Sequence, residues 1–159
     1  MIVVSDTSPL NYLVLLGAID FLPALFTGVA VPPIVLTELA HHRSPELVRI
    51  WANNPPSWLT VRSPLQVQSI SGLHRGETEA IALVEELRAD ALLVDERAAT
   101  EAATERGITV VRTISVLAKA VAAGMLDLQQ TIERLRQTNF RGPVEAMEQL
   151  VHEFRQRNS

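Results

Sequence analysis

Short apolar runs alternate with stretches of helical periodicity along the whole chain. Four runs, at 2–4 (IVV), 29–31 (VAV), 91–94 (ALLV) and 108–111 (ITVV), are almost continuously hydrophobic. Such runs are typical of parallel strands that are covered on both faces. A weaker run, LTV at 59–61, predicts an edge strand. Helical spacing predicts helices between them, at 8–17, 19–26, 33–42, 44–53, 75–88, 96–106, 113–124, 127–137 and 143–157.

This alternation predicts an α/β fold, a three-layer α/β/α sandwich around a short, mostly parallel sheet. The length of 159 residues suits one domain with a real core. We therefore expect a single domain over 1–159, with its core in 1–125 and C-terminal helices in 126–159.

The last predicted helix carries one apolar stripe. Its members follow helical spacing and are Val144, Met147, Leu150, Val151 and Phe154. Two interpretations remain open: the stripe packs on its own domain, or it docks a partner or a second copy.

Composition narrows the class of protein. Hydrophobic residues make up 47% and charged residues 20%, which is typical of a globular chain. The apolar runs fall far short of the ~20 residues that span a bilayer, and no secretory signal is evident. Cysteine is absent, which excludes disulfides and thiolate ligands. We expect a cytoplasmic protein without membrane contact.

The formal net charge of −4 argues against nucleic-acid binding through bulk positive charge. It leaves open a nuclease whose acidic site meets phosphate through metal ions. Lys119 is the only lysine, so the positive charge is nearly all arginine, which suits bidentate phosphate contact.

An aspartate follows each of two predicted strands. Ser8 can cap the first helix with Pro9 as its first residue, so Asp6 is not needed to start that helix. Asp95 directly follows ALLV. Both would lie at the carboxyl ends of parallel strands, where open α/β folds place their sites.

Two glutamates lie on apolar helix faces. Glu38 projects from the apolar flank of the helix that starts near Pro33. Glu77 shares a stripe with Ile81 and Val84, so it faces inward at the first turn of its helix. Glu79 lies off that stripe and is expected in solvent.

Each acid also has a structural explanation. Asp6 could form an Asx turn, Glu38 could pair with Arg43, Glu77 could favour its helix N-terminus, and Asp95 could cap the next helix. Taken together, however, inward carboxylates repel one another unless a cation neutralises them. Mg²⁺ prefers such oxygen ligands, so we interpret Asp6 as a metal-binding carboxylate.

The motifs SDTSPLNYL, RGETEAIAL and LLVDERAA, in this order, resemble the PIN domain, the metal-dependent nuclease fold of VapC-type toxin ribonucleases. The resemblance covers about residues 1–125. It implies a PIN-like fold with catalytic, metal-binding acids at Asp6, Glu38, Glu77 and Asp95. Glu96, adjacent to Asp95, is an alternative or additional metal ligand.

The resemblance also implies supporting roles for four small polar residues that could hydrogen-bond the carboxylates or position water. They are Ser8, Asn11, Thr113 and Ser115. For Thr113 and Ser115 an ordinary helix start remains an alternative.

The activity that the resemblance implies is cleavage of single-stranded RNA by water activated with Mg²⁺ or Mn²⁺. It further implies the toxin of a type II toxin–antitoxin pair, a small antitoxin protein as partner, and a homodimer. The main alternative is a catalytically weak PIN-like module that binds RNA or a protein partner. A purely structural partner-binding domain is another alternative, which the inward carboxylates disfavour. A phosphotransferase with Asp6 as nucleophile is disfavoured, because such enzymes usually have a second aspartate two residues later and a lysine, whereas position 8 is serine and Lys119 is the only lysine. A dinucleotide-binding enzyme is disfavoured because no G-x-G-x-x-G motif follows a predicted strand.

Overall fold

The computed structural model describes residues 1–158 and contains one five-stranded sheet with the order β3-β2-β1-β4-β5. All four strand pairings are parallel, which confirms the α/β prediction and extends it, because the 59–61 run also joins the sheet in parallel. The strands are β1 (Ile2–Ser5), β2 (Gly28–Val31), β3 (Leu59–Val61), β4 (Ala91–Leu93) and β5 (Val110–Val111).

Helices connect the strands, as parallel pairing requires. Over residues 1–158 they are α1 (Thr7–Leu15), η1 (Ile19–Phe21), α2 (Leu22–Leu25), α3 (Pro33–Leu39), α4 (Glu46–Asn53), α5 (Arg75–Leu87), α6 (Arg97–Glu105), α7 (Thr113–Ala122), α8 (Leu128–Arg136), η2 (Val144–Ala146) and α9 (Met147–Arg157), where η marks a 3-10 helix.

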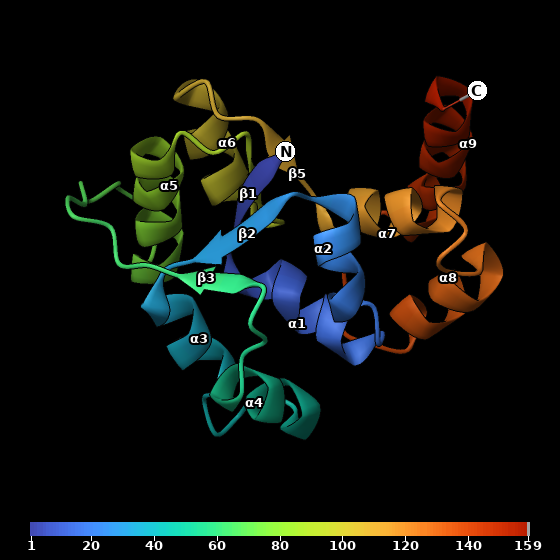
Figure 1. The fold of residues 1–159 in the computed structure, drawn as a ribbon, viewed down its shortest axis with the longest axis horizontal. Coiled ribbons are helices and arrows are strands. Elements are labelled where there is room, and N and C mark those ends of the chain that lie inside the picture. Colours follow the sequence, from blue (N-terminus) through green and yellow to red (C-terminus); the bar gives the residue numbers. More distant parts are fainter. Residues whose placement is uncertain (159) are drawn as a thin grey trace.

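The sheet separates two hydrophobic cores, because neighbouring strand residues point to opposite faces. Val3 packs into the larger core, with the helices α1, α7 and α9. Val4, the next residue, packs into the smaller core with Ile81 of α5 and Ala99 of α6. Figure 1 shows α5 and α6 on one side of the sheet and α1, α2 and α7 on the other. The three-layer sandwich is therefore confirmed.

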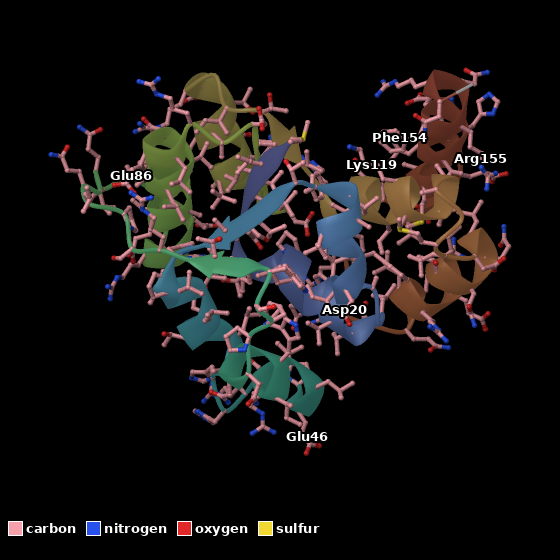
Figure 2. The ribbon with its side chains drawn as sticks, in the orientation of Figure 1. Asp20, Glu46, Glu86, Lys119, Phe154 and Arg155 are labelled. Atoms are coloured by element: carbon pink, nitrogen blue, oxygen red, sulfur yellow. The ribbon has the colours of Figure 1, made fainter. Side chains whose placement is uncertain are left out.

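The C-terminal stripe packs on its own domain, as the first interpretation proposed. Val144, Met147 and Val151 are buried in the larger core, and α9 lies against α7. Lys119 of α7 is 5.7 Å from the ring centre of Phe154 in α9, and Figure 2 labels both residues. Since the stripe is covered by its own chain, the docking interpretation is wrong for these residues.

The predicted helix at 8–17 begins one residue too late, and the predicted cap, Ser8, lies two residues after the observed one, Asp6. Helix α1 begins at Thr7, and Asp6 holds the N-cap position with an extended backbone and no capping hydrogen bond from its side chain. Pro9 is then the third helical residue. A proline is tolerated there because the first N–H groups of a helix have no intrahelical partner.

The remaining boundaries differ from the predictions by a few residues. The predicted helices at 19–26 and 143–157 each begin with a 3-10 turn, η1 and η2. Within residues 1–158, no single helix is long and apolar enough to cross a bilayer; α1 and the segment Ile19–Leu25 reach that length and composition only as a pair bent by 113°.

Candidate functional site

The candidate site lies at the carboxyl edge of the sheet, where β1 and β4 end side by side. The backbone N–H of Asp6 donates to the carbonyl oxygen of Leu93 at 2.9 Å, which continues the pairing of the two strands. Asp95 follows two residues after Leu93. The topology thus brings the ends of both aspartate-bearing segments to one edge, as the sequence predicted.

Asp6 is buried, with only 2% of its surface exposed. Its carboxylate oxygen Oδ1 is fully enclosed and has no hydrogen-bond partner. A buried carboxylate oxygen without a partner is costly, because it has lost its water without receiving a donor in exchange. A cation at this oxygen would offset that cost.

Glu38 reaches the same edge from α3 and contacts two other elements. The hydroxyl of Thr7, at the start of α1, donates to Glu38 Oε2. On the other side the carboxylate lies against the backbone of Gly76 in α5. A Cβ atom at position 76 would be only 2.6 Å from Glu38 Oε1, so the absence of a side chain there makes room for the carboxylate.

Glu77 lies at the third position of α5 and is 4% exposed. The backbone N–H of His74 donates to Glu77 Oε1 at 3.2 Å, which closes the helix N-terminus. The His74 ring lies between two acids, with Nε2 3.4 Å from Glu77 Oε1 and Nδ1 3.9 Å from Glu38 Oε1. The inward orientation predicted for Glu77 is therefore found, and its N-terminal role coexists with it.

The surroundings of Asp6 raise the pKa of its carboxyl from an ordinary 3.8 to about 6. Burial is the largest cause, because it disfavours the charged form. The backbone N–H of Thr7 lowers the pKa, the carboxylates of Glu77 and Glu38 raise it further, and His74 lowers it. Asp6, Glu38 and Glu77 thus form one electrostatically coupled group, which we call the acidic triad.

Asp95 has a different environment. Its two oxygens accept hydrogen bonds from the backbone N–H of Thr113 at 3.0 Å and from the Thr113 hydroxyl at 2.5 Å. Its charge acts on the phenol of Tyr12, whose pKa is raised mainly by burial and then by Asp95. The structure therefore places Asp95 at the same sheet edge, held by α7, on the side that faces Tyr12.

The structure tests the structural explanations offered above for Asp95 and Glu38. Glu96, exposed, holds the N-cap position of α6, so Asp95 does not cap that helix. Glu38 makes no ion pair with Arg43 among residues 1–158; its partners are Thr7 and His74. Both structural explanations offered for these acids are wrong, because each carboxylate instead points toward another element.

Among the four expected supporting residues, Thr113 donates to a carboxylate. Within residues 1–158, Ser8, Asn11 and Ser115 donate no side-chain hydrogen bond to an acid, although Ser8 lines a cavity next to Asp95.

The prediction that Glu79 lies in solvent is wrong: only 8% of its surface is exposed, and its Oε2 lies 2.8 Å from Arg75 Nε.

The acidic triad fits a hard divalent cation by its chemistry. All its donors are carboxylate oxygens, one of them buried without a partner, and Gly76 leaves space for another. Over residues 1–158, no three acidic or histidine side chains converge into a complete metal-binding group.

Three residues of the site escaped sequence reasoning: Thr7, His74 and Gly76. Gly76 and His74 stand immediately before the inward Glu77, in the segment HRGE. A glycine inside the first turn of a helix is unfavourable by itself, and this is the signal that could have indicated a close neighbour. Thr7 carries no such signal, because its contact is made across 31 residues.

Comparison with known proteins agrees with this architecture. A family model described as a PIN domain matches residues 2–156. Among solved structures, a PilT N-terminus domain protein from the hyperthermophilic archaeon Sulfolobus solfataricus P2 is similar with a TM-score of 0.50 and 14% identity, over 89% of this chain and 100% of that chain. At this identity the likeness concerns the fold alone. No curated protein matches the sequence.

Proposed function

Since the chain belongs to the PIN-domain family, whose members are generally nucleases that use divalent metals, we propose that it is a metal-dependent endoribonuclease that cleaves single-stranded RNA. The RNA substrate, the metal and endonucleolytic cleavage are our proposal. Asp6 is the observation that best supports it. Its carboxylate is 2% exposed, has a buried oxygen without a hydrogen-bond partner, and has its pKa raised mainly by burial and further by the charges of Glu77 and Glu38.

The acidic triad would hold Mg²⁺ or Mn²⁺, with Asp95 or Glu96 as further ligands. When bound, such an ion lowers the pKa of water and polarises a phosphodiester. The chain contributes the positions of the ligands. Thr7 fixes Glu38 from α1, and Thr113 fixes Asp95 from α7.

His74 and Gly76 complete this arrangement. The His74 ring lies beside Glu38 and Glu77, with one ring nitrogen within 4 Å of each carboxylate. Gly76 lets the Glu38 carboxylate approach the N-terminus of α5, whose dipole favours negative charge. The chain thus keeps several carboxylates close together at one edge of the sheet.

Cleavage of a single-stranded RNA by the wild type and by Asp6→Asn tests this proposal. We expect the wild type to cleave with Mg²⁺ or Mn²⁺ and to stop with EDTA, and Asp6→Asn to lose at least about a hundredfold in rate, because it removes a ligand charge. Asp20→Asn is the matched control; Asp20 is exposed, lies in η1, and is labelled in Figure 2. Equal cleavage by wild type and Asp6→Asn would contradict the proposal.

A folded wild type that binds the metal and does not cleave RNA would favour the alternative, a catalytically weak PIN-like binding module. The resemblance to VapC-type toxins also supports two further proposals, a toxin role with a small antitoxin partner and a homodimer, and the composition supports a third, a cytoplasmic location. Growth arrest on expression, relieved by a neighbouring small gene, tests the first. Light scattering of the purified chain tests the second, and cell fractionation tests the third.

A further inference from the structure

A cavity of about 540 Å³ opens beside the acidic edge of the sheet. Four segments form its walls: the first turns of α1, the residues after β4, the start of α7, and the connection between α8 and η2. Ser8, two residues after Asp6, and the predicted site residue Asp95 both line it. It therefore borders the place where cleavage is proposed.

One wall of the cavity is aromatic. The rings of Tyr12 and Phe140 meet edge to face with their centres 5.0 Å apart, and the Tyr12 hydroxyl donates to Asn139 Oδ1 at 2.9 Å. Phe140 also lies tightly over Gly142, where a Cβ atom would be 2.4 Å from its Cζ. These contacts fix a half-buried phenyl ring at the cavity.

Cationic groups surround the same cavity. Arg97, Arg112 and Arg141 all line it, although the whole chain has a net charge of −4. Arg97 is paired with Glu101 at 3.0 Å. Among residues 1–158, Arg112 and Arg141 form no salt bridge, and both are exposed. Their guanidinium donors thus remain available to an anion.

We propose that this cavity is a nucleotide subsite for single-stranded RNA, with one base stacked against Phe140 and an adjacent phosphate bound by Arg112 and Arg141. The inference rests on the proposed function for its choice of ligand. Arginine matches phosphate geometry with two parallel hydrogen bonds, and aromatic rings stack any unpaired base.

The cavity's other polar groups suit a base edge. Whichever of Asp95 and Glu96 does not hold the metal supplies an acceptor for an amino group. The Asn139 amide nitrogen is a donor, and its Oδ1 accepts from Tyr12. The acids repel phosphate, so the phosphate is expected on the side of Arg112 and Arg141. A base in a duplex cannot stack here, which restricts the ligand to single strands.

The test measures binding separately from cleavage. A labelled single-stranded RNA of mixed sequence is titrated into Asp6→Asn protein by fluorescence anisotropy, at several salt concentrations. Adding Arg112→Gln or Arg141→Gln should weaken binding about fivefold to tenfold and reduce the salt slope by about 0.7, since each removes one phosphate contact. Arg155→Gln, exposed on α9 and labelled in Figure 2, should change neither.

The aromatic wall has its own variants. Phe140→Ala should weaken binding at least about fivefold with an unchanged salt slope, whereas Phe140→Tyr, which keeps an aromatic ring, should bind normally. Duplex RNA should bind each variant alike.

The inference is overturned if Arg155→Gln weakens binding as much as Arg141→Gln, or if the Asp6→Asn protein binds no single-stranded RNA. Failure of the proposed function has a different signature, in which these binding effects hold but wild type with metal cleaves nothing. Normal cleavage with unchanged KM in Arg112→Gln and Arg141→Gln would leave the function standing and remove the subsite.

Discussion

The Glu38 carboxylate occupies the space that a side chain at Gly76 would need, since a Cβ atom there would lie 2.6 Å from Glu38 Oε1. This contact joins α3 to the first turn of α5, and it explains a glycine that helix propensity alone disfavours by about 1 kcal/mol relative to alanine. A residue without chemistry of its own thus determines where one acid of the triad lies.

Gly76→Ala should therefore separate stability from activity. The Glu38 side chain is partly exposed and can swing outward, so the unfolding free energy should change by less than about 1 kcal/mol. The rate of RNA cleavage should fall at least about tenfold, because the carboxylate is displaced. In a Glu38→Gln background the same alanine should cost nothing further, and an additive loss would show that Gly76 acts by another route.

The buried Asp6 carboxyl should make the metal-free protein less stable as pH rises. Folded Asp6 holds its proton up to about pH 6, while the unfolded residue loses it near 3.8, so the folded state binds more protons between these values. Stability is fully present below the lower pKa and is lost as pH rises through the upper one, by about 3 kcal/mol.

Urea unfolding in EDTA from about pH 4 to pH 7 measures this effect. Asp6→Asn should lack the loss and be the more stable protein at neutral pH, with Asp20→Asn matching the wild type. A wild type that gains stability relative to Asp6→Asn over this range would contradict the assigned environment of Asp6.

Thr113 should act on the site through Asp95. Thr113→Val keeps the shape of this fully buried side chain and removes the hydroxyl that donates to Asp95 at 2.5 Å. A hydrogen bond to a charged group contributes about 1.5–3 kcal/mol, so we expect a destabilisation of that size together with slower cleavage. Thr113→Ser keeps the hydroxyl donor and should retain most of the stability and most of the cleavage rate. Thermal unfolding and RNA cleavage on the same samples measure the two.

Gly142 should determine the position of the Phe140 ring. Gly142→Ala places a methyl group about where the ring now lies, with 2.4 Å to Cζ, and should disrupt the edge-to-face contact with Tyr12. That contact is worth about 1 kcal/mol, which is the expected loss of unfolding free energy. The near-ultraviolet circular dichroism of Tyr12 should change; an unchanged spectrum and stability would mean that the ring moves freely.

Most strands and helices of the fold could be predicted from the sequence, because buried parallel strands and amphipathic helices have clear hydrophobic periodicity. The first and last residues of the helices could not be predicted as well. Ser8 looked like a cap because serine before proline often is one, whereas the helix begins at Thr7 and continues through Pro9. Local patterns do not show which of several adjacent starts the tertiary contacts favour.

The acids were readable from the sequence for a different reason. A charge at the end of an apolar strand or on an apolar stripe violates the local pattern, and such violations mark functional sites. Contacts between distant segments leave no such mark. The Tyr12–Asn139 hydrogen bond spans 127 residues, and the partners of His74 include Glu38 from another helix, so both were invisible before the structure.

Calorimetric titration of Mn²⁺ into the metal-free wild type and Asp6→Asn measures binding of the ion to the acidic triad without any substrate. We expect binding by the wild type and by Asp20→Asn, and a loss of binding in Asp6→Asn despite its intact fold. A folded wild type that binds no divalent ion would contradict this expectation, and the coupled carboxylates of Asp6, Glu38 and Glu77 would then have a structural role alone.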